Sequence, residues 1–197
     1  MLDDIKARAR GLVSPVGSAL ASVGITPNQI TVIGCLLNLV VAAVIATGNL
    51  LLGGVVLLLV AAFDTLDGAV ARAAGLSSTF GAFLDSTLDR YSEAFVFGGV
   101  IAYGVLSGGP DVIVLAYASA IGSLLVSYAR ARAEGLGMRG DVGWLQRPER
   151  IVLLGLGLVA GLLTPALWVL AVLTNFTAVQ RIVHVYRLTS AERSRDG

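Results

Sequence analysis

The amino-acid sequence predicts an all-α, polytopic membrane protein with six transmembrane helices and an N-terminal juxtamembrane amphipathic helix. Of its 197 residues, 56% are hydrophobic and 14% are charged, and the mean hydropathy is +0.83. Soluble domains carry about 25% charged residues. Six apolar stretches follow one another, each near the ~20 residues that a helix needs to cross a bilayer. We therefore expect one membrane domain over residues 24–190, with a polar tail at 191–197.

Residues 1–23 precede the first apolar stretch and predict an amphipathic helix lying on the cytoplasmic membrane surface. Basic residues are interleaved with apolar ones at near-helical spacing: Leu2, Ile5, Ala9, Leu12, Val13, Val16 and Leu20, with Lys6, Arg8 and Arg10. Pro15 is expected to kink or interrupt this helix. The segment lacks the long apolar core and the cleavage site of a signal peptide. An ordinary solvated arm is the alternative interpretation.

The six apolar stretches are expected to span the bilayer in succession. They are Ile30–Gly48, Leu50–Ala73, Thr79–Leu106, Asp111–Arg132, Arg150–Leu163 and Pro165–Arg187. Thr26 and Pro27 open the first one, because threonine is a favoured helix cap and proline fits the first helical position. The alternate gaps are marked by turn-forming residues at Gly48-Asn49, Gly108-Gly109-Pro110 and Thr164-Pro165.

The distribution of cations predicts the orientation of the chain in the membrane. The three marked gaps contain no Lys or Arg, and the 14 basic residues belong to the termini or to the opposite ends of the stretches. The positive-inside rule then places both termini, and the end of the second stretch and start of the third with their aspartates, on the cytoplasmic side of the cell membrane. His184, the only histidine, and the aromatic residues Trp144, Trp168 and Tyr186 are typical of helix ends at the membrane interface.

Four aspartates lie within 26 residues of this apolar sequence, at Asp64, Asp67, Asp85 and Asp89. Ionisable residues at membrane depth are costly and mark function by default. The first two are spaced i, i+3 and the last two i, i+4, so each pair shares a helical face. Residues 74–80 between the pairs read as a turn, which would let both faces point at one place. The cluster predicts a site for Mg²⁺, with Mn²⁺ possible, because hard cations prefer oxygen ligands.

The aspartates belong to the longer pattern D-x2-D-G-x2-A-R-x8-G-x3-D-x3-D, which also fixes Gly68, Ala71, Arg72 and Gly81. This pattern is the signature of the CDP-alcohol phosphotransferases, and the chain resembles that family at every fixed position. The resemblance implies six transmembrane helices, a homodimer, and transfer of a phosphate-linked group from a CDP-activated donor to an alcohol with release of CMP.

The expected chemistry gives each of these residues a role. Two metal ions held by the four aspartates would neutralise the donor diphosphate. Asp89 is also the candidate general base by resemblance, although a metal-bound carboxylate is a weak base and the two roles compete. The candidates for binding the CDP donor are Pro27, Thr31, Gly68, Arg72, Ser78 and Gly81. Close helix packing for the two glycines, and a topological charge for Arg72, are the alternatives.

The acceptor alcohol is indicated by residues later in the chain. The runs Ser127–Glu134, Gly140–Gly143, Arg147–Arg150 and Gln180-Arg181 resemble those of the phosphatidylinositol-phosphate synthases, although Arg130 replaces a lysine there. The resemblance implies that CDP-diacylglycerol donates and inositol phosphate accepts. A phosphorylated acceptor needs dedicated cations, and the candidates are Arg130, Arg147, Arg150 and Arg181. These arginines could instead serve topology alone, or pair with Glu149.

The alternatives to this interpretation are two other classes of function and one other acceptor. The net charge is only +1, so no nucleic-acid-binding face is expected. A cation transporter or channel would place its carboxylates at the membrane midplane, between broken helices. Here they cluster at one end of the predicted spans, which favours an enzyme. Glycerol 3-phosphate or another alcohol is the alternative acceptor for the same chemistry.

Overall fold

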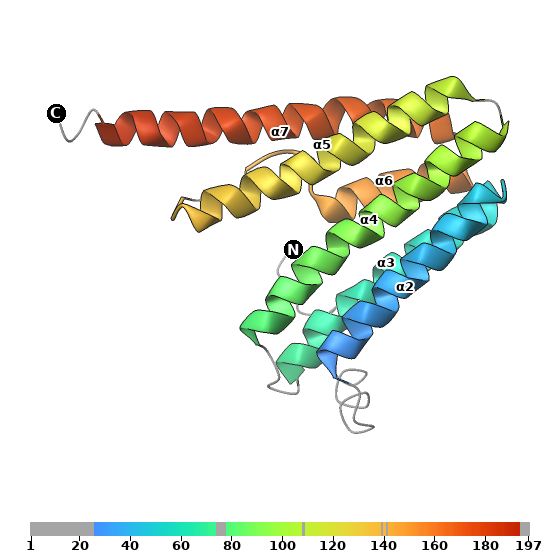
Figure 1. The fold of residues 1–197 in the computed structure, drawn as a ribbon, viewed down its shortest axis with the longest axis horizontal. Helices are drawn as coiled ribbons and strands as arrows, with labels where there is room; N and C mark the ends of the chain where they lie inside the picture. Colours follow the sequence, from blue (N-terminus) through green and yellow to red (C-terminus); the bar gives the residue numbers. More distant parts are fainter. Residues whose placement is uncertain (1–25, 74–77, 108, 139, 141, 194–197) are drawn as a thin grey trace, which may run out of the picture.

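Six α-helices account for nearly all of the residues that the structure describes (Figure 1). The computed structural model describes residues 26–73, 78–107, 109–138, 140 and 142–193, without the side chains of residues 65–73 and 191–193. The helices are α2 (Pro27–Ala46), α3 (Leu50–Ala73), α4 (Thr79–Ser107), α5 (Pro110–Gly135), α6 (Arg147–Val159) and α7 (Leu163–Arg193). The amphipathic helix expected over residues 1–23 and most of the turn expected over residues 74–80 lie outside the described residues.

The start of α2 shows how the sequence sets a helix boundary. The Thr26 hydroxyl accepts a hydrogen bond from the backbone N–H of Gln29, and the Gln29 side chain accepts one from the backbone N–H of Thr26 at 2.8 Å. This reciprocal cap satisfies two N–H groups that have no partner within the helix. Pro27 occupies the first turn, where no N–H is required. The predicted start of the first span is therefore confirmed to within a few residues.

The boundary predicted between the last two spans is wrong. Helix α6 runs from Arg147 to Val159, not from Arg150 to Leu163, and α7 already begins at Leu163. The turn falls at residues 160–162, where Gly161 has a φ of 69°. This left-handed conformation suits glycine and ends helices. Pro165, expected to mark the gap, instead lies in the first turn of α7, where a proline is tolerated because its missing N–H has no helical partner.

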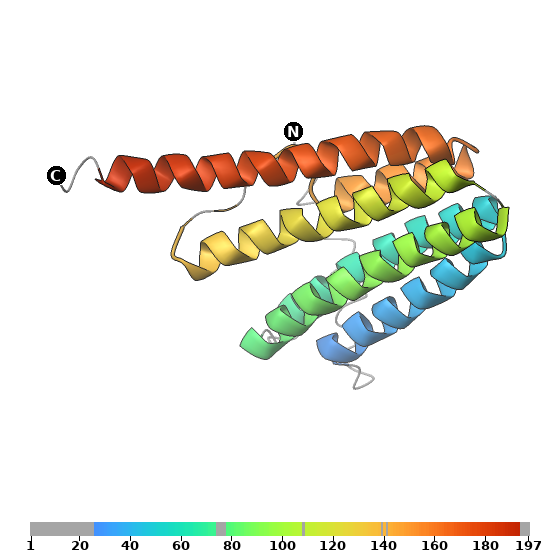
Figure 2. The same cartoon turned by 45° about the horizontal axis from the view of Figure 1, so that its top comes forward.

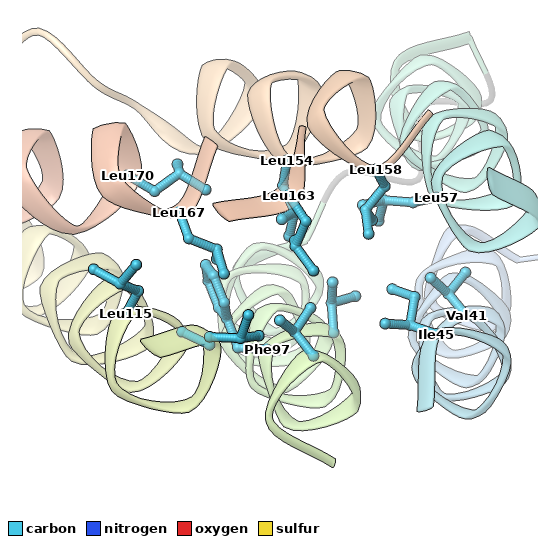
Figure 3. Close-up of a cluster of buried hydrophobic side chains, with 14 of the residues drawn as sticks. Val41, Ile45, Leu57, Phe97, Leu115, Leu154, Leu158, Leu163, Leu167 and Leu170 are labelled. Carbon is cyan, nitrogen blue, oxygen red and sulfur yellow. The ribbon is translucent and has the colours of Figure 1, made fainter. Parts of the chain in front are cut away.

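The helices pack in a closed ring, in the order α2, α3, α6, α7, α5, α4 and back to α2. Buried aliphatic side chains from all six helices fill the centre of this ring (Figure 3). Ile45 of α2, Leu57 of α3 and Leu158 of α6 are almost fully buried on one side of this core. Phe97 of α4 and Leu167 of α7 are buried on the other side. The core therefore fixes the mutual positions of the helices that carry the signature residues.

The connections α2–α3, α4–α5 and α6–α7 lie at one end of the bundle (Figures 1 and 2). The start of α2, the end of α3 and the start of α4 lie at the other end, which carries the signature. Three helices are long and apolar enough to cross a membrane, namely α2, α5 and residues 163–190 of α7, and a shorter apolar helix covers Leu50–Asp64. The described chain is thus all-helical, with three of the six predicted spans meeting both criteria.

Candidate active site

Helices α3 and α4 bring two of the signature aspartates together. Asp64 lies in the second half of α3 and Asp89 lies two turns or more inside α4, and their side chains are 18% and 17% exposed. Asp85 lies one turn before Asp89, and both residues line one cavity. Asp67 is part of the helical backbone of α3, and its side chain lies outside the described residues. The described carboxylates of α3 and α4 therefore lie on either side of the start of α6, whose Arg147 contacts both Asp64 and Asp89.

A single guanidinium group, that of Arg147 at the start of α6, joins Asp64 to Asp89. Its Nη2 atom lies 3.1 Å from Oδ2 of Asp64, and its Nη1 atom lies 2.8 Å from Oδ1 of Asp89. The Arg90 guanidinium contacts the other oxygen of Asp89 at 3.4 Å. Carboxylates from two helices thus lie within reach of one cationic group. Arg147, which the sequence predicted as a phosphate ligand, is placed directly beside the predicted metal ligands.

The donor set can be compared with the needs of a divalent cation. Within the described residues, no three His, Cys, Asp or Glu side chains converge as a metal site. Asp64 and Asp89 nevertheless present carboxylate oxygens to a common cation, and such oxygens are the ligands that Mg²⁺ and Mn²⁺ prefer. The chemistry of these two residues fits the metal site, and the four-aspartate set stays a prediction.

A cavity of about 450 Å³ opens beside these carboxylates. Asp85, Asp89 and Arg90 of α4 line one side. Arginines from three other helices line the rest of the cavity. They are the four that the sequence predicted for an acceptor phosphate: Arg130, Arg147, Arg150 and Arg181. One hollow therefore combines carboxylates for a metal with cations for an anion. The Nε–H groups of Arg90 and Arg147 are buried there, and neither has a hydrogen-bond partner among the described residues.

Arg150 forms the most buried ion pair in the described part of the chain. Its Nε and Nη2 atoms lie 2.8 and 2.9 Å from the two carboxylate oxygens of Glu93, and the side chains are 2% and 7% exposed. A third nitrogen, Nη1, donates to the Leu145 carbonyl at 3.3 Å. This fork geometry anchors the first turn of α6 to α4. The partners of Arg147 and Arg150 are Asp64, Asp89 and Glu93; the alternative partner, Glu149, is exposed.

The other two arginines differ in how firmly they are held. Arg181 of α7 is 3% exposed, and it donates from Nε to the Val142 carbonyl at 2.7 Å and from Nη1 to the Val126 carbonyl. It thereby ties the segment between α5 and α6 to both α5 and α7. Arg130 at the end of α5 is half-exposed and pairs with Glu134 one turn later, at 2.8 Å. Arg130 is therefore the arginine that can most readily be substituted without disturbing the fold.

The predicted nucleotide-binding residues lie near the starts of α2 and α4. The Thr31 hydroxyl donates to the carbonyl of Pro27 at 3.1 Å, one turn earlier in α2. The Ser78 hydroxyl accepts from the backbone N–H of Gly81 at 3.0 Å and so caps α4. A Cβ added at Gly81 would lie 3.1 Å from the side-chain oxygen of Asn28, so this glycine lets α2 and α4 approach. Gly68 and Arg72 lie on α3; the surroundings of Gly68 and the side chain of Arg72 are outside the described part of the chain.

Two residues of this site were missed by the sequence analysis. Glu93 continues the i, i+4 series of Asp85 and Asp89, so the spacing alone could have indicated it. Gly34 of α2 had no such signal. A Cβ added at Gly34 would overlap Oδ1 of Asp64, because α2 and α3 pack closely there. Only the packing of two helices reveals that this position must be small.

Comparison with known proteins gives a consistent result. A family model described as CDP-alcohol phosphatidyltransferase matches residues 24–187. A phosphatidylinositol phosphate synthase from Mycobacteroides abscessus is 38% identical over 87% of this chain and 82% of its own. An archaetidylinositol phosphate synthase from Pyrococcus horikoshii is also 38% identical, over 92% of this chain and 95% of its own.

Solved structures agree with these relatives. The fold is similar to the crystal structure of the Mycobacterium tuberculosis phosphatidylinositol phosphate synthase with CDP-DAG bound, with a TM-score of 0.82 and 33% identity. The match covers 88% of this chain and 93% of that one. A second structure of that enzyme, in complex with manganese and citrate, also gives a TM-score of 0.82, and the match covers 88% of each chain.

Proposed function

The chain belongs to the CDP-alcohol phosphatidyltransferase family, and on that premise we propose that it transfers a phosphatidyl group from CDP-diacylglycerol to inositol phosphate. The products are phosphatidylinositol phosphate and CMP. The observation that carries this proposal is that one cavity is lined both by the signature aspartates Asp85 and Asp89 and by four arginines. Relatives that share this reaction type are named for inositol phosphate as acceptor. The protein is accordingly a multi-pass membrane enzyme of phospholipid synthesis.

The reaction assigns one task to each side of the cavity. A hydroxyl oxygen of inositol phosphate attacks the β-phosphorus of the donor, the bond from that phosphorus to the CMP oxygen breaks, and the hydroxyl proton passes to a carboxylate. Asp89, at the cavity wall, is the candidate for that proton. A divalent metal held by the aspartates would supply charge neutralisation at the diphosphate. Mg²⁺, two ions and the full ligand set Asp64, Asp67, Asp85 and Asp89 are our proposal.

The acceptor side of the cavity is proposed to hold the phosphate of inositol phosphate. A phosphate dianion beside several aspartates would be repelled unless cations accompany it. Arg90 and Arg147 line the cavity and would bring positive charge close to a bound phosphate. Arg130 and Arg181 add charge at the opposite wall. The homodimer implied by the family resemblance stays a prediction.

The product lipid is the most informative readout for the proposed function. Purified protein is supplied with CDP-diacylglycerol, Mg²⁺ and either inositol phosphate or free inositol, and the extracted lipids are identified by mass spectrometry. The expected product carries both the phosphodiester and the phosphate monoester of the acceptor. A lipid with only a phosphodiester, formed from free inositol at equal rate, would contradict the assignment of the arginines.

Gly34→Ala is expected to reduce CMP release by roughly a hundredfold, because displacing a reacting group by about 1 Å can have an effect of that size. The added Cβ overlaps Oδ1 of Asp64 and must push that carboxylate or helix α2 aside. The matched control is Gly98→Ala on α4, where no atom lies within 4 Å of an added Cβ. Steady-state rates of the two variants are compared with that of the wild type. Equal rates in the two variants would mean that the position of Asp64 is not critical.

Arg130→Ala is expected to raise the KM for inositol phosphate about tenfold, the lower end of what loss of a charge-assisted hydrogen bond produces. The lower end applies because Arg130 is half-exposed. The KM for CDP-diacylglycerol should barely change. The control is Arg132→Ala. Arg132 is an exposed cation at the same end of α5, but it does not line the cavity. An unchanged inositol phosphate KM in the Arg130 variant would remove this residue from the acceptor site.

Both termini and the active-site end of the bundle are proposed to face the cytoplasm. Single cysteines are introduced at Asn49, in the exposed connection between α2 and α3, and at Leu136, exposed at the opposite end. The buried native thiol at Cys35 is first replaced by alanine. In intact cells, a membrane-impermeant maleimide should label Asn49→Cys and spare Leu136→Cys until the cells are opened. The reverse labelling pattern would invert the proposed topology.

A further inference from the structure

A second hollow, of about 520 Å³, lies on the outer side of α7, and we refer to it as the α7 groove. Its floor is one stripe of that helix, formed by Phe176, Val179, Gln180, Val183, His184 and Arg187. Its wall is formed by Val142, Gly143 and Trp144, in the segment that leads into α6. At a rise of about 1.5 Å per residue, the stripe is roughly 16 Å long.

The groove changes character along its length. At one end, the indole of Trp144 packs edge-on against Phe176, with ring centroids 5.9 Å apart. Val179 and Val183 continue this apolar surface, and both are exposed in the isolated chain. At the other end stand His184 and Arg187, towards the C-terminal part of α7. Apolar walls that lead to a cationic mouth match the order of acyl chain and phosphate in a phospholipid.

The polar groups of the groove form no ion pair with the residues that the structure describes. No carboxylate lines it, and within the described residues no ion pair involves His184 or Arg187. The Oε1 atom of Gln180 is buried and has no hydrogen-bond partner in that part of the chain. The polar groups open to a bound molecule are therefore His184, which is half-buried, and Arg187, which is exposed.

The local backbone holds the groove open. Gly143 has a φ of 122°, a conformation that side chains rarely adopt, and a Cβ there would overlap the Thr177 methyl group. This close approach lets the segment cross α7 directly and turns Trp144 outward. Arg181, on the neighbouring face of α7, donates to the Val142 carbonyl and lines the active-site cavity instead. The two hollows share no lining residue, so the α7 groove is a separate site.

We propose that the α7 groove binds an anionic phospholipid of the surrounding bilayer, distinct from the lipid substrate. The phosphate lies between His184 and Arg187. One acyl chain follows Val183 and Val179 to the Trp144–Phe176 pair. Charge selects the headgroup, because the mouth carries a cation and no carboxylate. The bound lipid would also cover Phe176, Val179 and Val183, which are exposed among the described residues.

Fluorescence quenching by brominated lipids tests this assignment directly. The chain has two tryptophans, so the Trp168→Phe protein reports on Trp144 alone. It is reconstituted into phosphatidylcholine bilayers that contain rising amounts of phosphatidylglycerol or phosphatidylcholine with dibrominated acyl chains. We expect phosphatidylglycerol to reach half-maximal quenching at an about fivefold lower mole fraction, the size of effect given by one cation near an anionic headgroup.

Three further quenching measurements decide the outcome. In the same background, Arg187→Gln combined with His184→Gln should abolish the preference for phosphatidylglycerol, whereas Arg132→Gln at the exposed end of α5 should retain it. Equal quenching by the two lipids, or a preference that survives the double substitution, would overturn the proposal. If an equimolar amount of unbrominated CDP-diacylglycerol restores the fluorescence, the groove is part of the donor site and the proposal is also overturned.

Discussion

Asp89→Asn is expected to reduce CMP release by more than a hundredfold. Loss of an outer-shell partner of a metal site already lowers activity or affinity by roughly 10- to 100-fold, and Asp89 is proposed to act at the reaction itself. Its Oδ1 atom lies 2.8 Å from Arg147, and it lines the cavity beside Asp85. Asparagine keeps the shape of the side chain and removes both its charge and its ability to take up a proton. The initial rate of CMP release in detergent measures the effect.

Binding of Mn²⁺, followed by electron paramagnetic resonance, separates the two roles proposed for Asp89. If the residue is a metal ligand, the affinity for Mn²⁺ falls together with the rate. If it is the base alone, Mn²⁺ affinity is retained while the rate is lost. Asp111→Asn, an exposed carboxylate in the first turn of α5 at the far end of the bundle, is the matched control. If Asp89→Asn lowers the rate of CMP release by less than tenfold, the reaction does not depend on Asp89.

Glu93→Ala is expected to lower the free energy of unfolding by about 3–5 kcal/mol, the usual effect of removing one partner of a buried ion pair. The reason is that Arg150, which is 2% exposed, would keep its charge in a site with no carboxylate partner. Both contacts of the fork, at 2.8 and 2.9 Å, are lost at once. Denaturant titration of the detergent-solubilised protein, followed by tryptophan fluorescence, measures the change.

A double variant, Glu93→Met with Arg150→Met, tests whether the pair serves position more than stability. Replacing a buried ion pair by apolar side chains of similar volume is often neutral or stabilising. We therefore expect stability close to that of the wild type. Activity should stay low, because Arg150 lies one turn after Arg147 and anchors the start of α6. A double variant that is both stable and fully active would show that this anchor has no part in the site.

Helix positions were largely predictable because local rules set them. Thr26 caps the start of α2, and Gly48, with a φ of 85°, follows its C-cap Thr47 in the connection to α3, as the turn-forming residues indicated. The α6–α7 boundary was mistaken because Pro165 marks a helix start as readily as a gap. Gly161, whose conformation decides the turn, carries no distinctive neighbour in the sequence.

The site was predictable in its residue types and less so in its contacts. The aspartate spacing indicated a cluster, and the later arginines indicated an anion site, since both rest on charge in an apolar sequence. That Arg147 joins Asp64 to Asp89 depends on α6 meeting α3 and α4 in space. Glu93 as the partner of Arg150, and Gly34 as the space for Asp64, have the same origin. Contacts between distant segments follow from packing, which no local pattern encodes.

CMP release by purified wild-type protein, with inositol phosphate, free inositol and glycerol 3-phosphate supplied in parallel, tests the central claim most directly. CDP-diacylglycerol and Mg²⁺ are held constant, and Asp89→Asn provides the background. We expect rapid release with inositol phosphate and release near background with the other two acceptors. Release with glycerol 3-phosphate alone would contradict the proposed acceptor, and no release with any of the three above that of the Asp89→Asn protein would contradict the proposed reaction.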